Sequence, residues 1–200
     1  MTPLLSLSRL IDTISTWAGK LTMWLILATT LISAGNALVR KAFNQSSNGL
    51  LEIQWYLFAA VFMLGAGYGF LKNSLVRIDF ISSKLSDRSR NWVDVVGILA
   101  VLFPFCAIGI ALGWPFFYQA YVSGEMSQNA GGLIRWPAYG LIPLGFALLM
   151  MQGVSELIKR IAFLTGNGPD VLSGEESKSD EQKHLEELEA QAARLLAGDK

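Results

Sequence analysis

The sequence predicts an all-α membrane protein with four transmembrane helices, and three observations carry this prediction. Of the 200 residues, 52% are hydrophobic and only 16% are charged, whereas soluble globular domains carry about 25% charged residues. Four segments reach the length of about 20 mostly apolar residues that a bilayer requires. Basic residues gather in alternate connections between these segments, as they do in multi-pass membrane proteins.

The membrane domain is expected at residues 21–163. Its four spans are expected at about 21–39, 52–71, 93–114 and 136–158. The last two spans contain Pro104 and Pro143, which neighbouring helices of a membrane bundle tolerate because they satisfy the backbone groups that proline frees. Four core helices of a soluble protein are the alternative, but the chain offers few polar faces that could cover such a core.

Lysine and arginine residues indicate the orientation. If the N-terminus is cytoplasmic, nine of the basic residues before position 170 lie on the cytoplasmic side, and three lie on the outer side: Arg40, Lys41 and Arg135. Short cytoplasmic loops carry an excess of basic residues. We therefore expect both termini in the cytoplasm, with outer connections at residues 40–51 and 115–135.

The two ends of the chain are expected to lie outside the four spans. Residues 1–20 should form an N-terminal interfacial helix, whose apolar residues recur at helical spacing: Leu7, Leu10, Ile11, Ile14 and Trp17. A disordered leader is the alternative. Residues 164–200 should form an acidic cytoplasmic linker and a short amphipathic tail helix, because positions 170–200 hold nine acidic and four basic residues.

Residue types that carry chemistry are scarce. The single histidine, His184, lies in the tail, and the single cysteine, Cys106, lies in the third span. Haem in a four-helix bundle needs ligands, usually histidine, from the spans, and no cysteine and histidine cluster suits zinc. A Ser-His pair at depth and a phosphate-binding glycine loop are also missing. We therefore expect no enzyme activity, no cofactor, no metal and no nucleic-acid partner.

The span centres favour a scaffold over a conduit. Ionisable groups inside a bilayer mark ion and substrate pathways, but here Glu52, Asp94 and Glu156 lie near the span ends. Gly65 and Gly69 form a surface of small residues that allows close helix approach. These glycines either pack the four helices together or meet another subunit.

The surroundings of the second span resemble a known family. Arg40 ends the first span, Glu52 opens the second, and the chain continues as FMLGAGYGFLKNSLVRIDF. Over about residues 10–163, this pattern resembles the small membrane subunit of TRAP (tripartite ATP-independent periplasmic) transporters, the DctQ-like family. The later segment SQNAGGLIRWPAYGLIPLGFALLMMQG is similar to members associated with organic monoacids and 2-oxo acids.

Two positions depart from the family pattern. The family often opens the second span with two acidic residues, whereas here Leu51 precedes Glu52. Leu75 occupies the usual histidine position at the exit of that span, so Arg77 and Asp79 are the charged residues that match. A role that needs a titrating imidazole at this exit is excluded for this chain.

The resemblance implies a three-protein complex in the bacterial inner membrane. A periplasmic substrate-binding protein would capture an organic acid, a large membrane subunit would import it with sodium, and this chain would be the small scaffold subunit in the lipid bilayer. The candidate subunit-interface or membrane-anchoring residues are Arg40, Glu52, Trp55, Gly65, Gly69, Arg77, Asp79 and Arg135.

Alternatives remain for these residues and for the function. Basic residues such as Arg40 and Arg77 could simply extend to lipid headgroups. The chain could also be a self-contained four-helix carrier or channel, or a membrane adaptor unrelated to transport.

Overall fold

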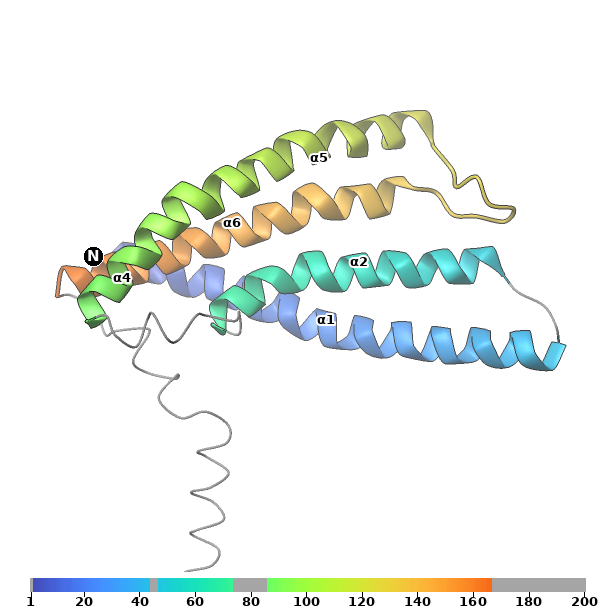
Figure 1. The fold of residues 1–200 in the computed structure, drawn as a ribbon, viewed down its shortest axis with the longest axis horizontal. Coiled ribbons are helices and arrows are strands. Elements are labelled where there is room, and N and C mark those ends of the chain that lie inside the picture. The colour runs from blue at the N-terminus through green and yellow to red at the C-terminus, as the bar shows by residue number, and fades with distance from the viewer. Residues whose placement is uncertain (1, 44–46, 74–85, 167–200) are drawn as a thin grey trace, which may run out of the picture.

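A computed structural model of the chain describes residues 2–43, 47–73 and 86–166 (Figure 1). Within this part, four helices are long and apolar enough to cross a membrane: Pro3–Phe43, Asn48–Leu71, Asp87–Ser123 and Trp136–Leu164. The prediction of an all-α protein with four candidate spans is therefore confirmed. The predicted tail helix lies outside the described residues.

The helices form an elongated bundle around α6. Helix α1 (Thr2–Phe43) packs on α2 (Asn48–Leu71), and both contact α6 (Trp136–Leu164). Helix α5 (Phe103–Ser123) covers another side of α6, which is the most buried of the four candidate spans. The first residues of α1 and the last of α6 lie at the same end of the bundle (Figure 1). The cytoplasmic location of both termini stays a prediction.

The third candidate span is a rod with one wide turn. It consists of α4 (Asp87–Gly97), the π-helical turn η1 (Ile98–Leu102) and α5 (Phe103–Ser123). The Phe103 amide donates to the Ile98 carbonyl, five residues back, which is the π-helical spacing. The next residue, Pro104, has no amide hydrogen to donate. The helix therefore continues from the π-helical turn through Pro104.

Helix α1 is continuous across residue 20 and presents its polar side to the bundle. Buried polar residues recur at intervals of seven: Ser8, Ser15, Thr22, Thr29 and Asn36. Of the predicted apolar residues in the first turns, Ile11 is buried, whereas Leu7, Leu10 and Trp17 are exposed. The apolar side of α1 therefore faces away from α6. The interfacial position of residues 1–20 stays a prediction.

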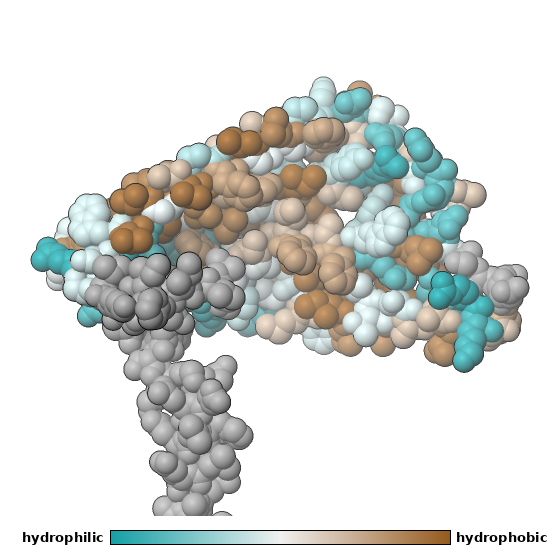
Figure 2. All heavy atoms as spheres, viewed as in Figure 1, coloured by the Kyte–Doolittle hydropathy of each residue, from teal (hydrophilic) through white to brown (hydrophobic). Residues whose placement is uncertain are grey.

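The surface pattern suits a membrane. Figure 2 shows hydrophobic residues over the middle of the elongated molecule and hydrophilic residues gathered towards its two ends. Large exposed apolar side chains include Trp24 at 70%, Phe62 at 72% and Val101 at 69% exposure. Lipid or a protein partner must cover such a surface.

Glycines let the helices approach α6 closely. A Cβ atom at Gly145 of α6 would lie 2.6 Å from Cβ of Met63 on α2 and 2.9 Å from the Met63 carbonyl oxygen. A Cβ atom at Gly113 of α5 would lie 2.8 Å from a methyl carbon of Ile142. Packing is a main source of helix association in lipid, so these contacts hold α6 at the centre.

We predict that Gly145→Ala lowers the free energy of unfolding by about 1–3 kcal/mol, because the added methyl group meets the α2 backbone. Unfolding in detergent micelles measures this change. Gly35→Ala is the matched control, since a Cβ atom there meets nothing within 4 Å and alanine favours helices over glycine. Equal stability of the two variants would contradict the close α2 and α6 contact.

Candidate functional site

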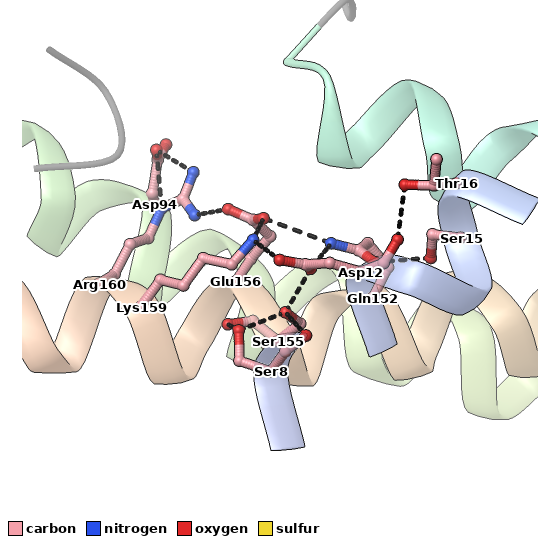
Figure 3. Close-up of polar contacts among 10 residues, drawn as sticks. All are labelled: Ser8, Asp12, Ser15, Thr16, Asp94, Gln152, Ser155, Glu156, Lys159 and Arg160. Atoms are coloured by element: carbon pink, nitrogen blue, oxygen red, sulfur yellow. Dashed lines mark hydrogen bonds and ion pairs between the residues drawn. The ribbon is translucent and has the colours of Figure 1, made fainter. Parts of the chain in front are cut away.

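A buried polar network joins α1 to α6 at the end of the bundle that holds the N-terminus (Figure 3). The hydroxyl oxygens of Ser8 and Ser155 lie 2.7 Å apart, and Ser15 donates to the Gln152 side-chain oxygen at 2.6 Å. Asp12 Oδ1 accepts from Ser155 Oγ at 2.7 Å and from Gln152 Nε2 at 3.1 Å. The N-terminal part of the polar side of α1 is therefore hydrogen-bonded to α6, whereas Thr22 and Thr29 donate to carbonyl oxygens of α1 itself.

Ion pairs extend this network to α4. Lys159 Nζ lies 2.8 Å from Asp12 Oδ2 and 2.9 Å from Glu156 Oε1. Arg160 donates to Glu156, and its Nε and Nη2 atoms donate to Asp94 Oδ2 at 3.1 and 3.0 Å. One row of side chains thus connects three helices, as Figure 3 shows.

The centre of the network is buried, and its two cations, Lys159 and Arg160, each pair with carboxylates of the same network. Glu156 is fully buried and Arg160 is 1% exposed. Each cation contacts two carboxylates, and each of the three carboxylates, Asp12, Asp94 and Glu156, contacts at least one cation. Removing one partner of a buried ion pair is costly because a charge is left unpaired. This arrangement can fix helices in place.

A second polar cluster, which we call the Glu52 clamp, lies at the opposite end of the bundle. Glu52 lies in the second turn of α2, which begins at Asn48, and is 4% exposed. Its carboxylate accepts hydrogen bonds from the Ser127 hydroxyl, from Asn129 Nδ2 at 2.8 Å and from the Leu133 amide at 2.7 Å. The carboxylate thereby holds the loop between α5 and α6.

Arg135 completes the same loop. Its Nη1 lies 2.9 Å from Glu125 Oε1, and an isolated antiparallel bridge joins Met126 and Ile134 between them. The hydrogen bond that Arg135 donates to Tyr139, followed by the contact with Glu125, raises the pKa of Arg135 above its usual value. The ion pair between Arg135 and Glu125 therefore joins the two ends of the loop.

Of the six predicted candidates that the structure describes, it brings two together at one loop. Glu52 and Arg135 shape the same loop, whereas Arg40 is exposed and Trp55 is 66% exposed. Gly65 faces α1, where its Cβ atom would lie 3.6 Å from the Thr22 methyl carbon. Gly69 is partly buried on α2. Arg77 and Asp79 lie outside the described residues.

Sequence reasoning missed the buried network. Gln152, Glu156 and Arg160 are spaced four residues apart on α6, and this stripe was a usable signal. It identifies one polar face of a helix, but not the helix that covers that face. In the described part of the chain, no group of three or more His, Cys, Asp or Glu side chains could hold a metal ion.

Comparison with known proteins identifies the chain. A family model described as "Tripartite ATP-independent periplasmic transporters, DctQ component" matches residues 29–163, more than half of the sequence. The chain belongs to the DctQ family. Neither a curated protein nor a solved structure matches it. The predicted family is therefore confirmed, and this DctQ component is the small membrane subunit of a TRAP transporter.

The matched range contains one polar cluster completely and the other only in part. It contains the whole Glu52 clamp and the α4 and α6 side chains of the network, from Asp94 to Arg160. Ser8, Asp12 and Ser15 precede residue 29 and lie outside the match. The α1 side of the network is thus a feature of this DctQ component that the family match does not cover.

We predict that Arg160→Met lowers the free energy of unfolding by about 3–5 kcal/mol, because Asp94 and the fully buried Glu156 both lose their ion pair with Arg160. Thermal unfolding in detergent measures the loss. Arg9→Met is the control, since Arg9 is an exposed residue of α1 close to the network in sequence. Similar stability of both variants would show that the network contributes nothing to folding.

We predict that Glu52→Gln speeds hydrogen exchange at the Leu133 amide about tenfold or more. The glutamine side chain has an NH2 group in place of one carboxylate oxygen, so the loop donors lose one of their two acceptor atoms. Leaving a buried donor without an acceptor costs about 1–3 kcal/mol. Exchange measured by mass spectrometry reports the change. Glu125→Gln should have a smaller effect, since the Glu125 side chain is 39% exposed and exposed ion pairs contribute little. Unchanged exchange in Glu52→Gln would refute the clamp.

Proposed function

We propose that this DctQ component is the scaffold of a sodium-driven transporter that imports an organic acid. A periplasmic binding protein delivers the acid, the large membrane subunit carries it with sodium, and this chain supports the large subunit. The ion and substrate sites belong to the large subunit. The chain lies in the bacterial inner membrane with both termini in the cytoplasm.

The length of the apolar surface on α1 carries this proposal. Exposed large apolar residues run from Leu4 to Val39, a distance of about 53 Å at 1.5 Å per residue. The hydrocarbon core of a bilayer is only about 30 Å thick. A bilayer covers this length only if the helix is steeply tilted, whereas an apolar partner that extends beyond the hydrocarbon covers it directly.

The buried network supports a scaffold for a second reason. Its charges pair within the chain and connect α1, α4 and α6. Helices held in this way move as one body, and a scaffold must resist the movement of the subunit it supports. Charges that serve transport must instead bind and release an ion or a substrate.

The candidate interface residues divide by location. Arg40 and Trp55 are exposed and free to meet a partner or lipid headgroups. Glu52 and Arg135 act through the loop that they hold, which we propose to face the periplasmic binding protein. The contact of Gly65 with Thr22 favours internal packing for the glycine surface.

The test compares transport by the complete complex and by the chain alone. Liposomes with both membrane subunits and the binding protein should take up an organic monoacid or 2-oxo acid in a sodium-dependent manner. Liposomes with this chain alone should show none. Saturable uptake by the chain alone would favour the self-contained carrier, and uptake by the complex without sodium would refute the proposed coupling.

The same preparation tests the surface of α1. The variant Leu7→Gln/Leu10→Gln places polar groups on the exposed N-terminal part of that surface, and retention of the large subunit during purification should fall at least fivefold. Thr13→Gln is the control, because Thr13 is already an exposed polar residue of α1. Full retention by the double variant would show that the large subunit does not contact this part of α1.

A further inference from the structure

An apolar groove lies between α1, α2 and α6. It encloses about 690 Å³, within the range of about 300–1,000 Å³ typical of small-molecule sites. The residues that matter for its properties are Trp17, Lys20, Trp24, Leu64, Leu144 and Leu148. We call it the tryptophan groove.

The groove opens where the polar contacts between α1 and α6 end. Among the described residues, Ser15 of α1 makes the last side-chain hydrogen bond to α6 in the direction of the opposite end. Beyond it, α1 stays close to α2 through the contact of Gly19 with Tyr68 and that of Thr22 with Gly65. Leu144 and Leu148 of α6 then form one wall of the groove.

Lys20 is the one charged residue among those that line the groove. It is exposed, and no ion pair to it is found in the described part of the chain. Asp12 and Lys159, by contrast, pair with each other nearby. An ammonium group beside an apolar surface in a membrane requires an anion or contact with water.

The two tryptophans place Lys20 at the level of the lipid headgroups. Trp17 and Trp24 lie three residues before and four residues after it, and they are 72% and 70% exposed. These positions share one side of a helix, and tryptophan prefers the membrane interface because its ring is apolar and its N–H group is polar.

The length of the uncharged part of α1 agrees with a position of Lys20 at the lipid headgroups. Residues Leu21–Val39 carry no charge and rise about 28 Å, close to the hydrocarbon thickness of about 30 Å. Lys20 and Arg40 are the exposed cations at the two ends of this stretch. Lys20 therefore lies where lipid phosphate groups lie.

We propose that the tryptophan groove binds one anionic phospholipid. The phosphate pairs with Lys20, and an acyl chain lies against Trp24, Leu144 and Leu148. A lipid supplies both the anion and the flexible apolar chain that the groove needs. A helix of another subunit would have to place an acidic residue against an apolar wall. This proposal concerns the chain by itself and does not depend on its role in transport.

Native mass spectrometry of the purified full-length chain, supplied with equal amounts of phosphatidylglycerol and phosphatidylethanolamine, tests the proposal. The wild type should retain one phosphatidylglycerol in preference to phosphatidylethanolamine. Lys20→Gln should lower phosphatidylglycerol retention about fivefold, the effect expected for one basic residue near an anionic lipid. Leu144→Trp should fill the groove and lower retention of both lipids.

Lys41→Gln is the matched control, because Lys41 is an exposed cation at the other end of α1 and is not among the groove residues. The Lys41→Gln variant should retain as much phosphatidylglycerol as the wild type. Equal losses in Lys20→Gln and Lys41→Gln would overturn the proposal, as would a wild type without bound lipid. Displacement of the lipid by the large subunit, with cross-linking of a Trp24→Cys variant to that subunit, would identify the groove as a protein-docking site instead.

Discussion

The hydrogen bonds between α1 and α6 determine how the rest of this bundle is arranged. Lipid tails are as apolar as leucine, so helices in a membrane gain little from burying apolar side chains against one another. Ser8, Asp12 and Ser15 add hydrogen bonds to the close packing of the helices, and they orient α1 with its polar side towards α6. The outward position of Trp17 and Trp24, and the groove beside them, follow from that orientation.

The two ends of the bundle are stabilised in different ways. At the N-terminal end, charged side chains of three helices meet, and Arg160 connects α6 to α4. At the other end, Glu52 accepts hydrogen bonds from the loop between α5 and α6, which is also held by the Arg135–Glu125 ion pair and by one isolated bridge. The ion-pair network fixes three helices to one another, and the Glu52 clamp fixes the loop between α5 and α6.

Much of the fold was predictable, because span length and composition depend on the bilayer and hardly on partners. The family was also predictable from the residues around Glu52. The function of Glu52 as a clamp was not, since the loop residues Ser127, Asn129 and Leu133 follow no periodic pattern. The network was missed because Gln152, Glu156 and Arg160 indicate a polar face only, and the helix that covers it lies about 140 residues earlier in the chain.

The seven-residue spacing of the buried polar residues in α1 has a consequence for the alignment of the helices. Ser8, Ser15 and Thr22 are chemically alike, so sliding α1 by one repeat, about 10.5 Å, until Ser15 and Thr22 take the places of Ser8 and Ser15, would again set hydroxyl groups against Ser155 and Gln152. Asp12 has no acidic equivalent at position 5 or 19, which are Leu5 and Gly19. Its ion pair with Lys159 therefore distinguishes the correct register from the slipped ones, much as a single buried asparagine sets the register of a coiled coil.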